Sequence, residues 1–116
     1  MVAVTLYHNP RCSKSRAALA LLEERGAAVE VVRYLATPLD EAGLRELLRR
    51  LGRPAAELVR RSEPEYKAAG LGPASDEDQL LAAMATHPKL MERPVAVAGE
   101  RAVIGRPPER VLELLS

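Results

Sequence analysis

The sequence predicts a single α/β domain in which helices flank a mixed β-sheet. Its N-terminal part alternates strand, helix and strand, its middle carries helical patterns, and its end combines two short apolar strands with a closing helix. At 116 residues the chain has the usual length of one domain. A domain of that length buries roughly two thirds of its extended surface, so its core needs no disulfide or metal.

The N-terminal part predicts a βαβ unit. "VAVTLY" (Val2–Tyr7) is short and β-branched and precedes the turn-forming "HNP", which indicates a buried strand. From Ser13 to Arg25 apolar residues recur at helical spacing beside a charged face, and Gly26 supplies a stop signal. "VEVVRY" (Val29–Tyr34) is the second strand. Because a helix connects them, the two strands should be parallel and adjacent.

The middle of the chain predicts three helices, over residues 40–51, 54–60 and 75–86. "TPLD" precedes the first helix, and "GRP" separates it from the second. Ser75 followed by Asp78 resembles a capping box, which predicts that the third helix begins after Ser75.

The C-terminal part predicts a hairpin and a last helix. "PVAVAG" (residues 94–99) and "RAVIG" (residues 101–105) meet at a Gly-Glu pair, which suits a tight turn. "PPERVLELL" (residues 107–115) reads as a closing helix with proline in its first turn. We therefore expect one domain, 1–116, in which a helical insertion of about residues 38–90 divides the βαβ unit from the ββα end.

Composition and charge exclude several classes of function. The net charge is +1, so the overall field gives no reason to expect binding to nucleic acid or to a membrane surface. The chain starts without a basic leader or a long apolar segment, and its one cysteine cannot form an internal disulfide. Both features favour the reducing cytoplasm. Arginine is so common that a single arginine is informative only where its position is unusual.

The lone cysteine, Cys12, lies in "YHNPRCSKSR" (residues 7–16). Free cysteines are often inert and buried, but Cys12 lies where a strand ends and a helix begins. Unpaired N–H groups and the helix dipole stabilise an anion at such a point. Cationic neighbours favour the thiolate further. We predict a reactive thiolate, supported by nearby charge from His8, Arg11, Lys14 and Arg16.

"YHNPRCSKSR" after an N-terminal strand resembles the active-site loop of the glutaredoxin-linked arsenate reductase family. The likeness covers nearly the whole chain, because three later blocks resemble the family's later blocks in the same order. They are "LVRRSEPEYKAAGL", "DEDQLLAAMATHPKLMERPVAV" and "VIGRPPERVLELL". The resemblance implies a thioredoxin/glutaredoxin-like fold with an inserted helical region.

The resemblance also implies an activity in arsenic resistance. Cys12 would attack arsenate and form a thiol–arsenate adduct, while His8 would help to hold the thiol ionised. Glutathione would attack next, and glutaredoxin would complete the reduction to arsenite. The chain has no second cysteine to resolve the adduct, so the electrons must come from outside. No bound cofactor or metal is expected.

Three arginines, Arg60, Arg93 and Arg106, lie at expected boundaries between elements. By resemblance to the family, they would grip the oxyanion beside the catalytic cysteine. Guanidinium groups suit a tetrahedral oxyanion because each offers parallel donors and a permanent charge. Pro94 should follow a cis peptide bond, since it opens the strand that passes the active-site helix in such a fold. His87 is expected to cap a helix rather than to catalyse.

Two alternatives stay open. One is a glutathione-dependent thiol-disulfide reductase on the same scaffold, and the other is a non-catalytic Spx-like regulator that binds a protein partner. Related regulators that bind RNA polymerase often carry two cysteines three positions apart, but Ser15 takes the second place here, so that redox switch cannot form. The three arginines favour the oxyanion enzyme over both alternatives.

Overall fold

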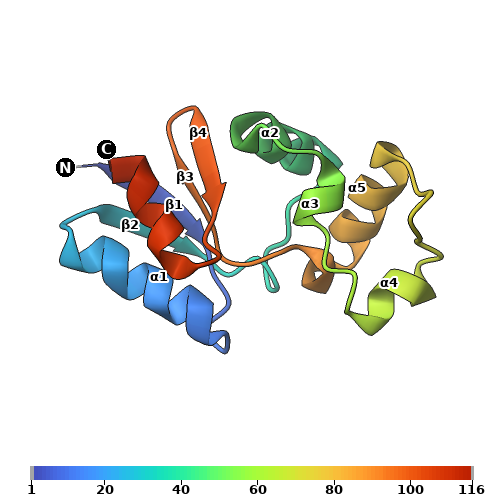
Figure 1. Cartoon of the computed structure of the whole chain (residues 1–116), viewed down its shortest axis with the longest axis horizontal. Coiled ribbons are helices and arrows are strands. Elements are labelled where there is room, and N and C mark those ends of the chain that lie inside the picture. The colour runs from blue at the N-terminus through green and yellow to red at the C-terminus, as the bar shows by residue number, and fades with distance from the viewer. Residues whose placement is uncertain (1, 116) are drawn as a thin grey trace. The chain divides into compact units, whose positions relative to one another are not determined.

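The computed structural model describes residues 2–115 and contains a four-stranded mixed β-sheet (Figure 1). The strand order is β2-β1-β3-β4. β1 pairs with β2 in parallel, as the βαβ pattern predicts, while β3 is antiparallel to both β1 and β4. The strands are β1 (Ala3–Tyr7), β2 (Ala28–Val32), β3 (Val95–Ala98) and β4 (Arg101–Ile104).

Five α-helices and two 3-10 helices are found in the described part of the chain. They are α1 (Ser13–Glu24), α2 (Glu41–Leu51), α3 (Ala55–Leu58), α4 (Pro64–Ala68), α5 (Glu77–Thr86), η1 (Pro88–Leu90) and η2 (Pro108–Leu115). The sequence reasoning missed α4, although a proline at its first position is a start signal. The closing segment, expected to be an ordinary helix, is 3-10 throughout.

The chain divides into two compact units. Unit 1 contains the described residues up to Thr37 together with those from Arg93 onward, and therefore the whole sheet, α1 and η2. Unit 2 is Pro38–Glu92, and its regular secondary structure consists of helices and one isolated β-bridge. The helical insertion expected at about 38–90 has nearly the bounds of unit 2, and the single-domain organisation stays a prediction.

The core of unit 1 forms where α1 and η2 pack against the sheet (Figure 1). Side chains four apart on α1 face the strands, as the 3.6-residue period of a helix requires. Full burial of one large aliphatic side chain contributes about 1.5–3 kcal/mol, so this cluster holds α1 against the sheet. Its buried members are Val4, Leu6 and Ala96 from the sheet, Ala18 and Leu22 from α1, and Val111 and Leu114 from η2.

The β3–β4 hairpin turns through Gly99 and Glu100, as the sequence predicts. Gly99 has φ 59°, a left-handed conformation that glycine adopts at little cost. Pairing continues past the strand ends, because the N–H of Gly105 donates to the carbonyl oxygen of Pro94 at 2.8 Å. This bond brings the backbone next to Arg93, the residue before Pro94, close to the backbone next to Arg106, the residue after Gly105.

The start of α5 corrects one detail of the sequence analysis. Its N-cap is Asp76, one residue later than the Ser75 that was expected. The Asp76 carboxylate accepts from the Gln79 N–H, and the Gln79 side chain accepts from the Asp76 N–H, which completes a capping box. Ser75 is engaged elsewhere, since its hydroxyl oxygen accepts from the N–H of Gly72.

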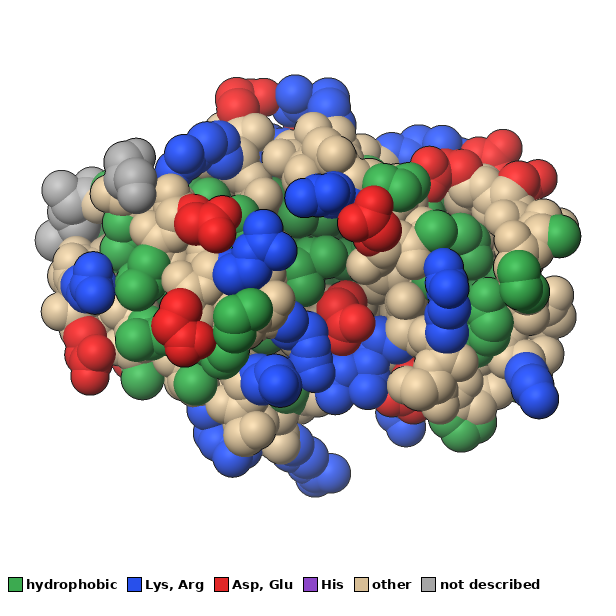
Figure 2. Space-filling model, in the orientation of Figure 1, with side chains coloured by type: hydrophobic (Ala, Val, Ile, Leu, Met, Phe, Trp, Pro, Cys, Tyr) green, Lys and Arg blue, Asp and Glu red, His purple; other side chains and the backbone are tan. Residues whose placement is uncertain are grey.

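Acidic and basic side chains share the face shown in Figure 2, in keeping with a net charge of +1. In unit 2, α2 packs against α5 through buried leucines and a methionine, with polar groups turned outward. Within residues 2–115, every helix is too short or too polar to cross a bilayer.

Candidate active site

Cys12 is the N-cap residue of α1, and its thiol is half-buried. Burial raises the pKa of this thiol, but the backbone N–H groups of Ser15 and Lys14 lower it, and so do the guanidinium groups of Arg93 and Arg106. The lowering effects prevail, so the pKa lies below its ordinary value. A thiol at the N-terminus of a twelve-residue helix with two arginines acting on it is suited to nucleophilic attack on an anion.

A hydrogen-bonded turn around Asn9 positions Cys12. The N–H of Cys12 donates to the carbonyl oxygen of Asn9 at 3.0 Å, and the N–H of Arg11 donates to the Asn9 side-chain oxygen at 3.0 Å. The N–H of Asn9 in turn donates to the hydroxyl oxygen of Ser15 at 3.0 Å. The turn is thus tied to the first turn of α1, which keeps Cys12 beside the helix N–H groups.

His8 precedes this turn in the chain and contacts Ser15, with 2.6 Å between His8 Nδ1 and Ser15 Oγ. Both side chains are buried, His8 at 5% and Ser15 at 0% exposed. Burial lowers the pKa of His8, and the nearby charges of Arg33 and Arg16 lower it further. A neutral imidazole gives Cys12 no positive charge, so we expect any effect of His8 on the thiol to pass through its hydrogen bond to Ser15.

The basic residues next to Cys12 in sequence, Arg11, Lys14 and Arg16, are exposed at the surface. Arg16 donates through Nη1 to the carbonyl oxygen of Pro10 at 3.0 Å, which helps to close the turn. The side-chain charges that lower the thiol pKa therefore come from far away in the sequence, contrary to the expectation that neighbouring cations supply them.

Arg93 and Arg106 are two of the three arginines assigned to the oxyanion. Val95 pairs with Ile104 in the β3–β4 hairpin, and continuing this register outward places Arg93 opposite Arg106. Both are half-buried and both lower the pKa of the Cys12 thiol. Two guanidinium groups that act on the same thiol are an arrangement suited to binding an anion, because each offers parallel donors and a permanent charge.

The peptide bond between Arg93 and Pro94 is cis, which confirms the prediction for Pro94. The bond between Arg106 and Pro107 is also cis, a feature that the sequence analysis did not anticipate. The two arginines thus occupy equivalent local positions, each immediately before a cis-proline.

Arg60, the third arginine, lies in unit 2 just after α3. Its side chain forms an ion pair with Glu63, and its Nε lies 3.7 Å from Oε1 of Glu92. Its backbone N–H donates to the carbonyl oxygen of Leu90 at 2.7 Å. These acidic partners were not predicted from the sequence, although Glu63 lies only three residues after Arg60. Its role toward an oxyanion stays a prediction.

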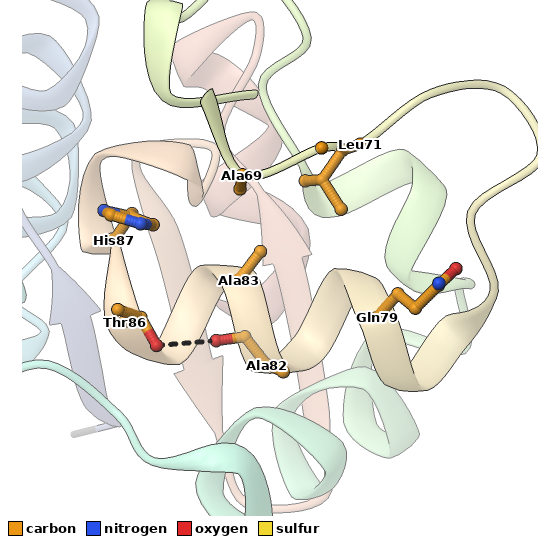
Figure 3. A pocket seen from close by; sticks show the side chains of 8 residues that line it. Ala69, Leu71, Gln79, Ala82, Ala83, Thr86 and His87 are labelled. Carbon is orange, nitrogen blue, oxygen red and sulfur yellow. Dashed lines mark hydrogen bonds between the residues drawn. The ribbon is translucent and has the colours of Figure 1, made fainter. Parts of the chain in front are cut away.

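His87 ends α5, as expected, and its N–H donates to the carbonyl oxygen of Ala83 at 2.7 Å. Its ring also borders a pocket of about 320 Å³ within unit 2, where Ala69, Leu71 and Gln79 face the same space (Figure 3). None of the residues assigned to catalysis or oxyanion binding lines this pocket.

Residues 7–114 match the ArsC family, from the residue before His8 to the last turn of η2. The chain belongs to the ArsC family. The match includes the Cys12 loop, both units and the two arginine positions of the hairpin.

Individual members of the ArsC family resemble the chain over almost its whole length. It is 55% identical over 114 residues to the uncharacterized protein YfgD of Escherichia coli K12, covering 97% of this chain and 96% of the relative. It is 49% identical over 117 residues to the arsenate reductase of Neisseria meningitidis serogroup A, covering 99% and 100%.

A solved structure extends the likeness to three dimensions. The arsenate reductase from Vibrio cholerae is 46% identical, covers 97% of this chain and 98% of its own, and superposes with a TM-score of 0.93. This neighbour, with the ArsC-family match, confirms the expected thioredoxin/glutaredoxin-like α/β fold.

Proposed function

We propose that the protein is an arsenate reductase in which the Cys12 thiolate is the nucleophile. The observation that carries this proposal is the convergence of three effects on one thiol: the N-terminus of α1, Arg93 and Arg106. Membership of a family in which full-length relatives are named arsenate reductases supports it. An inert thiol would need neither a lowered pKa nor two arginines acting on it.

The first requirement of the reaction is to bring two anions together. A thiolate and arsenate repel each other, and Arg93 and Arg106 offset this repulsion with fixed positive charge. Their paired forks also orient the tetrahedral oxyanion through several parallel donors. We assign a third oxyanion contact to Arg60, on the resemblance stated above.

The chemistry then proceeds by exchange at arsenic. Cys12 Sγ attacks As(V) and an oxygen leaves as water, which gives the thiol–arsenate adduct. The thiol of glutathione replaces a second oxygen. A glutaredoxin thiolate then attacks the glutathione sulfur, a mixed disulfide forms, and the electron pair of the S–As bond reduces arsenic to As(III). Hydrolysis releases arsenite and regenerates Cys12.

External thiols are required because Cys12 is the only cysteine in the chain. A single cysteine can form the adduct but has no partner with which to form an internal disulfide. Glutathione and glutaredoxin supply the two electrons, and a reducing cytoplasm is the compartment that maintains both. With this division of labour, we expect the reaction to need no bound cofactor.

His8 acts as a positioning residue in this scheme. Its ring holds the buried Ser15 hydroxyl, and the backbone N–H of Ser15 is one of the groups that stabilise the thiolate. The ring therefore helps to keep the backbone N–H groups in the first turn of α1 directed at the Cys12 thiol.

The experiment that tests the proposal is an assay of arsenate reduction with glutathione, with and without glutaredoxin. We expect arsenite to form only when both are present, and Cys12→Ser to form none. A parallel assay uses a glutathione mixed disulfide as substrate. Reduction of the disulfide without any reduction of arsenate would reject the proposal in favour of the thiol-disulfide reductase, and no turnover of either would favour the non-catalytic regulator.

A further inference from the structure

Gly105 joins the two arginine-bearing segments of the hairpin. It follows β4 directly and precedes Arg106, and its N–H donates to the carbonyl oxygen of Pro94 at 2.8 Å. Because Pro94 follows Arg93, this single hydrogen bond ties together the backbones on which both arginines are carried. Gly105 is itself buried.

The contact at Gly105 leaves no room for a side chain. A Cβ atom added there would lie 2.8 Å from Cγ of Pro94 and 3.0 Å from Cγ1 of Val111. Pro94 and Val111 are fully buried, and neither a proline ring nor a packed valine has a flexible end that could swing aside. The backbone of Gly105 lies outside the left-handed region, so space, and not conformation, requires glycine here.

We infer that Gly105 is a positioning residue for the oxyanion site, because its missing side chain sets the separation between the segments that carry Arg93 and Arg106. The inference rests on the proposed function, in which these two arginines bind arsenate beside Cys12. We assign Gly105 no direct role toward the thiol or the substrate.

A side chain at position 105 has a predictable effect. The new Cβ pushes the end of β4 away from Pro94 and lengthens the hydrogen bond between Gly105 and Pro94. Arg106 moves with it, away from Arg93 and from the thiol. A displacement of about 1 Å at such a position can cost on the order of 100-fold in rate, because the donors no longer match the oxyanion.

The chain offers a matched control in Gly72 of unit 2. Among the described residues, none has an atom within 4 Å of a Cβ built at Gly72, and its backbone is also outside the left-handed region. Gly72→Ala therefore makes the same chemical change without the contact. Comparing it with Gly105→Ala separates the effect of the crowded position from the general effect of replacing glycine.

The test measures thermal unfolding, the pH dependence of Cys12 alkylation and kcat/KM for arsenate in both variants. We expect Gly105→Ala to lose at least tenfold in kcat/KM and to shift the alkylation inflection to higher pH, while Gly72→Ala matches the parent in both. A folded Gly105→Ala protein overturns the inference if its kcat/KM lies within a factor of two of the parent and its alkylation inflection lies at the parental pH.

A second variant covers the case in which Gly105→Ala does not fold. Gly105→Ala with Val111→Ala removes one of the two contacts and leaves the one with Pro94. A raised alkylation inflection in this folded double variant supports the inference, and a parental inflection overturns it. Failure of both variants to fold also overturns it, since Gly105 would then serve the fold alone. If the parent itself does not reduce arsenate, the proposed function fails while alkylation still decides the role of Gly105.

Discussion

Arg93 and Arg106 each lie two positions beyond the last strand pair of the β3–β4 hairpin, Val95 and Ile104, and both lower the pKa of the Cys12 thiol. An anion bound between the segments that carry them would be stabilised by both guanidinium charges. In the proposed function these two arginines, which are distant in sequence, form one anion-binding site beside Cys12.

This relationship predicts that tetrahedral anions stabilise the protein. Sulfate or arsenate should raise the unfolding temperature of the parent, by an amount equivalent to about 2.7 kcal/mol when the anion is at 100 times its Kd. Arg93→Ala and Arg106→Ala should lose most of this shift, and Cys12→Ser should keep it because the arginines remain. The measurement is thermal unfolding with and without the anion.

The control for this experiment is Arg101→Ala, at the turn end of the same hairpin. Arg101 donates to the backbone oxygen of Glu113 and is exposed. Sulfate also stabilises proteins generally, through exclusion from their surfaces. If all three arginine variants show the same shift as the parent, the stabilisation is of this general kind and the paired site does not bind anions.

The rate of Cys12 alkylation by a neutral reagent should depend on pH with an inflection below that of a free cysteine. Truncating Arg93 or Arg106 should move the inflection upward, because each guanidinium lowers the thiol pKa. Above both inflections the parent and the variants should react at similar rates, since the thiol is then fully ionised in each. An inflection at or above the free-cysteine value in the parent would mean that burial dominates.

The lowered pKa of His8 predicts that the stability of the protein depends on pH. Its pKa in the folded protein is below the ordinary value of 6.5, so the unfolded chain binds the proton first as pH falls. Stability should therefore decline as pH drops through about 6.5 and level off below the folded-state pKa, by about 1.4 kcal/mol for each unit of lowering. Denaturant unfolding of the parent and His8→Asn between pH 8 and pH 5 measures this.

The asparagine in His8→Asn can still bond Ser15 but does not titrate, so the difference between the two pH curves isolates His8 from the carboxylates. Parallel curves of stability against pH for the parent and His8→Asn would show that His8 binds protons equally in the folded and unfolded states. They would contradict the view that burial and the charges of Arg33 and Arg16 lower the pKa of the ring.

Much of the fold was predictable because its signals are local. The turn between β3 and β4 was recognised from one Gly-Glu pair, and the strand-turn-helix at Cys12 from apolar spacing and turn residues. The start of α5 was misplaced because Ser75 and Asp76 are both good caps, and the bond between Ser75 and Gly72 decides between them. That bond belongs to a loop whose shape no periodic pattern specifies.

The residues of the candidate site were easier to predict from the sequence than their arrangement in space. Counting outward equally from Gly99 and Glu100 reaches Arg93 and Arg106, so their pairing could have been read once the hairpin was assigned. The contact between His8 and Ser15 could not, because it depends on how the loop folds back onto α1. Burial of His8, which removes its charge, is likewise a property of packing and not of sequence.

Two variants are needed to test the proposed oxyanion contact of Arg60, because its side chain already forms an ion pair with Glu63 within unit 2. If Arg60 grips the oxyanion, Arg60→Ala should lower kcat/KM for arsenate by roughly tenfold or more. Glu63→Gln, which removes the partner but keeps the guanidinium, should remain within about a factor of two. Equal losses in the two variants would show that the ion pair, and not a contact with arsenate, accounts for the effect.

The most direct test of the central claim is kcat/KM for arsenate in Arg93→Ala and Arg106→Ala, with Arg101→Ala as the control. Each lost charge-assisted contact should reduce kcat/KM by roughly tenfold to a few hundredfold, and Arg→Lys at either position should recover only part of it, because lysine restores the charge without the fork. Arg101→Ala should equal the parent. If Arg93→Ala and Arg106→Ala both reduce arsenate within a factor of about two of the parent, these arginines do not bind the oxyanion and the account is wrong.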